Sequence, residues 1–82
     1  MTKPGYVYIL ASELDASRHY TGCTTNLEAR LKKHNAGDVP HTAKFKPWHL
    51  ETAIAFRSKC KARAFEAYLK SGSGREFARR HF

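Results

Sequence analysis

The start of the chain holds two short runs of strand-forming residues separated by a polar turn, and this pair restricts the fold more than any other feature. Residues 5–12, GYVYILAS, combine β-branched and aromatic residues, a composition typical of a strand. Residues 13–17, ELDAS, are polar, and residues 18–24, RHYTGCT, are again strand-like. Two such runs joined by about five residues predict a β-hairpin. We therefore expect a mostly antiparallel sheet.

The hairpin is followed by a segment that predicts an amphipathic helix. Thr25 precedes Glu28 by three residues, which is the spacing of a capping box. The helix is expected to run to about Ala36 and to stop at Gly37.

A loop and a third strand come next. Residues 38–48, DVPHTAKFKPW, contain two prolines and no periodicity, and a loop of this length in a small domain tends to be functional or mobile. Residues 49–56, HLETAIAF, predict a strand. The alternating positions expected to share one face of this strand are Leu50, Thr52, Ile54 and Phe56.

Two further helices are predicted after this strand. Ser58 is the expected N-cap of a helix through Lys70. The SGSG segment then breaks the chain, and Ser73 with Glu76 repeats the capping-box spacing before a short last helix, REFARRHF. The predicted order is β-β-α-β-α-α. The predicted fold class is α/β, with a small three-stranded, mostly antiparallel sheet flanked by three helices in a single domain, residues 1–82.

Composition supports a small basic protein that contacts phosphate groups. The chain has 82 residues, and 15 lysines and arginines against seven acidic residues give a net charge of +8. Nucleic-acid-binding proteins have such a charge, although basic surfaces also serve solubility. No apolar run is long enough for a signal peptide or a membrane span, so we expect a cytoplasmic protein without membrane contact. Cys23 and Cys60 are then expected to be reduced thiols.

The first predicted helix carries two polar residues at an unusual position. Leu27 and Leu31 lie four residues apart and mark its buried stripe. Arg30 and His34 project within roughly 60° of Leu27, at the flank of that stripe. Each has a structural explanation, since an arginine can lay its methylenes on a core and a histidine can favour a helix C-terminus.

The second predicted helix carries a carboxylate at a similar position. Ala62, Phe65 and Leu69 form its apolar face, and Glu66 lies about 40° from Ala62. A carboxylate at a core boundary needs a hydrogen-bond partner, a cation or a metal, and a salt bridge would satisfy it without any function.

Taken together, these residues include the groups that phosphoryl chemistry requires. Tyr8 and Tyr20 of the hairpin precede the helix with Arg30 and His34, and Glu66 follows on a later helix. A phenol or an imidazole can take a proton from water, a guanidinium can hold phosphate oxygens, and a carboxylate can hold Mg²⁺.

The same residues lie in segments that resemble a known family. YVYIL at residues 6–10, followed by Tyr20-Thr21-Gly22, resembles the paired signature of the GIY-YIG nucleases. NLEARLKKHNAG resembles the family segment N-L-x-x-R-L-x-x-H-N-x-G, and AFEAYLKSGSGREF resembles its later E-x-x-L-K segment. The chain is most similar to small single-domain members related to the nuclease module of the UvrC excision-repair subunit.

The resemblance implies a role for each candidate residue. Tyr8 would be the general base for the attacking water, and Tyr20 would support that water or the phosphate. Arg30 would stabilise charge on the scissile phosphate, and His34 would hydrogen-bond the phosphate or assist proton transfer. Glu66 would bind one divalent cation, Mg²⁺ with Mn²⁺ as the alternative.

The signature departs from the family pattern at a few positions. The first triplet is Tyr-Val-Tyr and the second is Tyr-Thr-Gly, and both keep the residues with chemical roles. The implied role of Gly22 is to allow close packing of the backbone. An asparagine that some members carry near the C-terminal end of the site has no counterpart here.

The resemblance implies a Mg²⁺-dependent endonuclease acting on nucleic acid, with DNA as the expected substrate and repair or recombination as the expected setting. Basic side chains are expected to bind the nucleic acid, and the candidates are Lys32, Lys33, Lys44, Lys46, Lys70 and Arg75. Trp48, Phe45 and His41 could stack on bases or cover the sheet edge. The alternative function is a basic module of the same fold that binds nucleic acid without cutting it.

Overall fold

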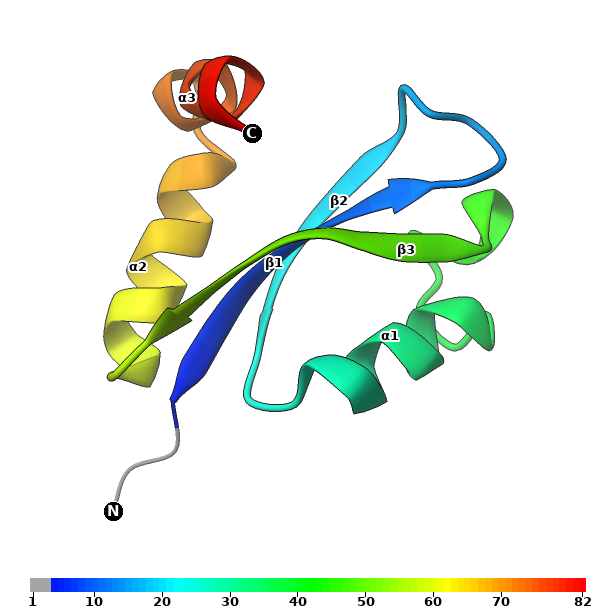
Figure 1. Cartoon of the computed structure of the whole chain (residues 1–82), viewed down its shortest axis with the longest axis horizontal. Coiled ribbons are helices and arrows are strands. Elements are labelled where there is room, and N and C mark those ends of the chain that lie inside the picture. Colours follow the sequence, from blue (N-terminus) through cyan, green and yellow to red (C-terminus); the bar gives the residue numbers. More distant parts are fainter. Residues whose placement is uncertain (1–3) are drawn as a thin grey trace.

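The computed structural model describes residues 4–82 and contains one sheet and three α-helices (Figure 1). In chain order the elements are β1 (Gly5–Ser12), β2 (His19–Thr24), α1 (Leu27–Asn35), the 3₁₀ turn η1 (Ala43–Phe45), β3 (Trp48–Phe56), α2 (Lys59–Leu69) and α3 (Gly72–His81). The strand order is β2-β1-β3, and both pairings are antiparallel. The predicted order and fold class are confirmed. None of the helices in residues 4–82 is both long and apolar enough to cross a membrane.

The central strand β1 divides the core into two halves, because alternate side chains of a strand point to opposite faces. Tyr8 and Leu10 pack with Trp48 on the face covered by α1. Val7 and Ile9 pack with residues of α2 on the opposite face. Figure 1 shows α1 and α2 on the two sides of the sheet. A functional site that uses both helices must therefore reach around an edge of the sheet.

A β-bulge corrects one prediction for β3. Ile9 pairs with Thr52 but Leu10 pairs with Leu50, so Glu51 is an extra residue in β3. Because one inserted residue reverses the alternation, Leu50 shares the α1 face with Leu10, while Thr52 shares the α2 face with Ile9. The expectation that Leu50, Thr52, Ile54 and Phe56 lie on one face is wrong for Leu50.

The N-terminal cap of α1 also differs from the prediction. Asn26 is the N-cap, and its side-chain oxygen accepts a hydrogen bond from the backbone N–H of Ala29 at 3.0 Å. The Thr25–Glu28 capping box does not form. The Thr24 hydroxyl accepts the N–H of Asn26 at 3.1 Å, which turns the chain one residue later than expected. Asparagine is also the better N-cap. The predicted stop at Gly37 is confirmed, since Gly37 adopts φ +80°.

The cap of α3 is displaced in the opposite direction. Ser71 is its N-cap and accepts the N–H of Gly74 at 3.1 Å, whereas Ser73 lies inside the first turn and caps nothing. The prediction for Ser73 with Glu76 is wrong because α2 ends at Leu69 and α3 follows almost at once. The predicted cap of α2 is confirmed, since Ser58 accepts the N–H of Cys60 at 3.1 Å.

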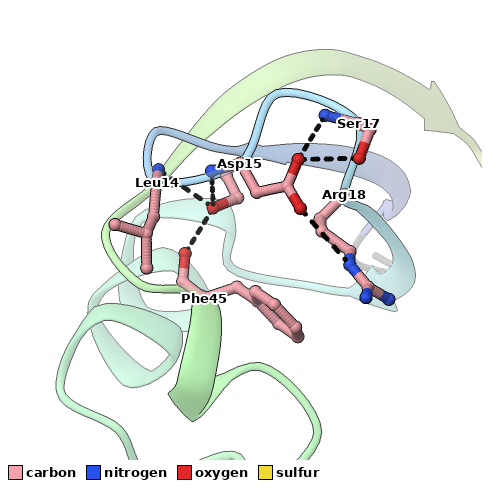
Figure 2. Close-up of polar contacts among 6 residues, drawn as sticks. Leu14, Asp15, Ser17, Arg18 and Phe45 are labelled. Carbon is pink, nitrogen blue, oxygen red and sulfur yellow. Dashed lines mark hydrogen bonds and ion pairs between the residues drawn. The ribbon is translucent and has the colours of Figure 1, made fainter.

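The long loop after α1 is fastened to the tip of the β1–β2 hairpin. The buried Ser12 hydroxyl donates to the carbonyl of Phe45 at 2.5 Å and accepts the N–H groups of Leu14 and Asp15 at 3.1 Å (Figure 2). Figure 2 also shows the Asp15 carboxylate holding the hairpin loop together, and the Arg18 guanidinium lies 4.5 Å from the centre of the Phe45 ring. These contacts give the loop a defined position against the hairpin tip.

Candidate active site

Two tyrosines and a histidine form an aromatic cluster on the α1 face of the sheet. Tyr8, from β1, is 2% exposed, and its hydroxyl lies 3.0 Å from Nε2 of His34 on α1. The ring centres of Tyr20 and His34 lie 4.9 Å apart. His34, which was predicted at the flank of the Leu27–Leu31 stripe, is the fully buried side chain of α1. The structure brings these three predicted residues together.

Gly22 is required for this cluster because the Tyr8 side chain lies across it. Gly22 pairs with Tyr8 in the sheet, and a Cβ atom at this position would lie 2.3 Å from the Tyr8 hydroxyl oxygen. A side chain other than hydrogen would displace the tyrosine. The resemblance implies that Gly22 allows close packing. In the structure, the group that packs against Gly22 is the Tyr8 side chain.

The second ring nitrogen of His34 contacts a residue from the long loop. Nδ1 lies 2.8 Å from the hydroxyl oxygen of Thr42, and that hydroxyl is 3.3 Å from the carbonyl oxygen of Val39. Thr42 is 1% exposed. It was not predicted as a site residue, because nothing in a loop without periodicity marks a residue that contacts a distant histidine.

The environment of the cluster favours the neutral forms of both Tyr8 and His34. Burial, reinforced by Tyr20, raises the pKa of Tyr8 to about 12, although the positive charge of Arg30 opposes this shift. Burial and the nearby Arg30 charge lower the pKa of His34 from its ordinary value of 6.5. At pH 7 the cluster thus contains a protonated phenol beside a neutral imidazole.

Arg30 and Glu66 meet in a cleft at the edge of the sheet, beside the end of β2. The cleft has a volume of about 560 Å³, and Arg30 reaches it from α1 while Glu66 reaches it from α2. The Arg30 Nε is buried and has no hydrogen-bond partner within residues 4–82. The Arg30 side chain also lines the cleft, and a guanidinium there is suited to an anion.

Glu66 is partly buried and already has a cationic partner. Its side chain is 23% exposed, and Oε2 lies 3.1 Å from the ammonium nitrogen of Lys70. That ammonium lies 5.6 Å from the centre of the Tyr20 ring, which links the cleft to the aromatic cluster. The salt bridge expected as a structural explanation of Glu66 is therefore present, and it lies within the candidate site.

Other groups also line the cleft. Lys59 and Arg63 precede Glu66 at helical spacing on α2, and this i, i+4, i+7 pattern could have identified them from the sequence. Cys23 lies beside them, and burial and the Glu66 carboxylate raise the pKa of its thiol. The thiol stays protonated at neutral pH and is no nucleophile. No group of three or more His, Cys, Asp or Glu side chains that could hold a metal occurs among residues 4–82.

The predicted nucleic-acid-binding residues lie at several separate places on the surface. Lys33 lines a hollow beside Arg30, and Lys70 and Arg75 line a hollow beside Tyr20. Lys32 instead pairs with the exposed Glu28 at 3.7 Å. Exposed positions in the loop around η1 are occupied by Lys44 and Lys46.

The three aromatic candidates for base stacking have different surroundings. Trp48 is 4% exposed, and its indole N–H donates to the carbonyl of Thr42 at 2.8 Å, so it belongs to the core. Phe45 is half-buried beneath the Arg18 guanidinium, and His41 is exposed.

Comparison with known proteins agrees with this geometry. The family described as the GIY-YIG catalytic domain matches residues 4–80. The chain is 39% identical over 72 residues to the UPF0213 protein BH0048 of Halalkalibacterium halodurans, a match that covers 87% of this chain and 74% of that protein. It also resembles the solution NMR structure of the UPF0213 protein BH0048 from Bacillus halodurans, with a TM-score of 0.56 and 36% identity over 93% of this chain and 80% of that one. This chain therefore belongs to the GIY-YIG family.

Proposed function

We propose that this protein is a nuclease that hydrolyses phosphodiester bonds in nucleic acid, with DNA as the expected substrate and Mg²⁺ as the expected cofactor. Membership of the family supports a nuclease-type activity. The observation that carries the proposal is the buried Tyr8–His34 hydrogen bond next to a cleft that is lined by the Arg30 guanidinium and the Glu66 carboxylate.

Proton transfer through Tyr8 requires His34. With a pKa of about 12, only about one Tyr8 in 10⁵ is a phenolate at pH 7. The Tyr8 hydroxyl therefore takes a proton from the attacking water while it gives its own proton to Nε2 of His34. The water oxygen bonds to phosphorus as the bond from phosphorus to the leaving oxygen breaks, and His34 is left as an imidazolium.

Arg30 provides positive charge where the phosphate gains negative charge. Arg30 lines the cleft, so its guanidinium can donate hydrogen bonds to a phosphate oxygen there. This makes the guanidinium a stabilising group for the transition state, because the phosphate oxygens carry more charge there than in the ground state. Tyr20 packs on His34 and limits water around the imidazole.

Glu66 fits a magnesium site of the kind that is completed by the substrate. Mg²⁺ often binds through one or two carboxylates together with waters and substrate phosphates, and the cleft offers one hard carboxylate. Glu66 would hold the cation, which would supply Lewis-acid stabilisation of the leaving oxygen. Cation binding would compete with the Lys70 ammonium for the same carboxylate.

The proposal is tested by cleavage of end-labelled single-stranded, flap and duplex DNA, and of matched RNA, with Mg²⁺, Mn²⁺ or EDTA. We expect metal-dependent products from the native protein and a loss of about 100-fold or more for Glu66→Gln. Glu28→Gln, which removes an exposed carboxylate paired with Lys32, is the matched control and should cleave normally. Equal cleavage by native protein and Glu66→Gln would contradict the proposal.

The alternative function is a binding module without catalysis. The Lys70–Glu66 ion pair favours it, because the carboxylate of the cleft is already neutralised. Retarded but intact nucleic acid under every metal condition would support this alternative.

A further inference from the structure

We propose that Thr42 is a positioning residue that selects the tautomer of His34 and thereby makes Nε2 the proton acceptor for Tyr8. The catalytic consequence rests on the proposed nuclease function. The tautomer itself is a property of the resting protein and can be measured without any substrate.

The cluster has few protons to share among its hydrogen bonds. A neutral imidazole carries one N–H, so one of its nitrogens donates and the other accepts. The Thr42 hydroxyl has a single proton and two contacts, to Nδ1 of His34 at 2.8 Å and to the carbonyl oxygen of Val39 at 3.3 Å. A carbonyl can only accept, so the Thr42 proton belongs on the Val39 side if both contacts are hydrogen bonds.

Only one arrangement then satisfies every group. Nδ1–H of His34 donates to Thr42, and Nε2 accepts the hydroxyl proton of Tyr8 across 3.0 Å. The opposite tautomer would use the Thr42 proton on Nδ1 and lose the 3.3 Å hydrogen bond to Val39, whose carbonyl also accepts the backbone N–H groups of Thr42 and Ala43. It would also present an N–H, rather than a lone pair, to the Tyr8 oxygen, and the proton relay could not start.

Thr42 is held in place by the loop that contains it. Its backbone N–H donates to the carbonyl of Val39 at 3.1 Å, and its own carbonyl accepts the indole N–H of Trp48 at 2.8 Å. The side chain of Asn35, next to His34, binds both the N–H and the carbonyl of Trp48, at 2.6 and 3.0 Å. The loop between α1 and β3 thus connects back to α1 at His34 and at Asn35.

Because both side chains are buried, the hydrogen bond between Nδ1 of His34 and the Thr42 hydroxyl can determine the tautomer. His34 and Thr42 are each 1% exposed, so water does not compete for Nδ1. The titratable and charged groups around the imidazole are Tyr8 of β1, Tyr20 of β2 and Arg30 of α1. Tyr8 contacts the other nitrogen, Nε2, and Arg30 is a donor, so neither replaces the Thr42 oxygen at Nδ1. Tyr20 contacts the imidazole as a ring.

The direct test is NMR of the histidine ring nitrogens in ¹⁵N-labelled protein at neutral pH, with His34 assigned by comparison with His34→Gln. We expect the native protein and Thr42→Ser to hold the proton on Nδ1. Thr42→Val, which keeps the shape of the side chain but removes the hydroxyl, should shift the proton toward Nε2. A proton on Nε2 in the native protein would overturn the proposal, and this result needs no variant to fold.

Activity provides the second readout. Thr42→Val should lower the single-turnover cleavage rate on the order of 10–100-fold, while Thr42→Ser should remain within about threefold of the native rate. Nucleic-acid binding in EDTA should be equal for all three proteins. An unchanged tautomer and rate in a folded Thr42→Val would overturn the proposal. If no protein cleaves but the tautomer responds to Thr42→Val, the positioning stands and the proposed nuclease function is what fails.

Discussion

The chemistry of the candidate site is decided by how a few side chains are buried. Tyr8 alone would be a poor base because its pKa is raised to about 12. His34 beside it is held in the form that can accept a proton, because burial and Arg30 disfavour the imidazolium. The neutral imidazole of His34 gives the Tyr8 hydroxyl an acceptor for its proton at neutral pH.

This pairing predicts a pH dependence of cleavage. The acceptor must be neutral, and the pKa of His34 is lowered, so the rate should be level near pH 7 and should fall by about tenfold per pH unit only below the ordinary histidine pKa of 6.5. Single-turnover rates between about pH 5 and 8 at saturating Mg²⁺ measure this decrease. His34→Gln should have a lower rate that does not decrease further at low pH. The same decrease in that variant would assign the titration to another group.

At the scale of elements, the site depends on an edge strand and on the junction between two helices. β2 is an edge strand, so α1 and α2 can approach its end from opposite faces and place Arg30 and Glu66 in one cleft. The junction between α2 and α3 is tight. A Cβ atom on Gly74 would lie within bonding distance of the Tyr68 carbonyl oxygen, whereas one on Gly72 would meet nothing within 4 Å.

This contrast predicts opposite effects for two glycines in one helix. Gly74→Ala should destabilise the protein by about 2–3 kcal/mol or more, because backbone must move to admit the methyl group. Gly72→Ala should be neutral or stabilising by up to about 1 kcal/mol, since alanine loses less entropy in a helix. Urea denaturation at constant m-value measures both. Equal midpoints for the two variants would show that the α2–α3 junction can relax.

At the scale of the whole molecule, positive charge continues from the cleft along β2. Lys70 and Arg75 line a hollow with His19 and Tyr20, and Arg75 also lines the adjoining hollow with Arg79 and Phe82 of α3. A nucleic-acid strand whose phosphate lies at Arg30 could follow this edge of the sheet. Lys44, near the far end of the long loop, lies outside both hollows.

This arrangement predicts which charges contribute to binding. Arg75→Gln should weaken binding of a single-stranded oligonucleotide in EDTA and lower the slope of log K against log salt by about 0.7, the value of one phosphate contact. Lys44→Gln is the charge-matched control and should leave the slope unchanged. Fluorescence anisotropy across a salt series measures both. Equal losses of affinity for the two variants would mean that net charge, and not the two hollows along β2, provides the affinity.

The sequence by itself determined the class of the fold and the types of chemical group. Strand composition, helical periodicity and the spacing of Tyr8, Tyr20, Arg30, His34 and Glu66 were sufficient because these signals are local or belong to the family signature. Helix boundaries were less secure, since Asn26 and Ser71 replaced the predicted caps through contacts only one to three residues away.

Only the tertiary structure decided the face of Leu50, the partner of His34 and the surroundings of the lysines predicted to bind nucleic acid. Leu50 changes face because of a bulge against β1, which depends on pairing between strands far apart in the sequence. Thr42 meets His34 because the long loop is bound to Trp48 and to the hairpin tip. Such contacts form only when segments far apart in the sequence pack together, so local sequence patterns do not predict them.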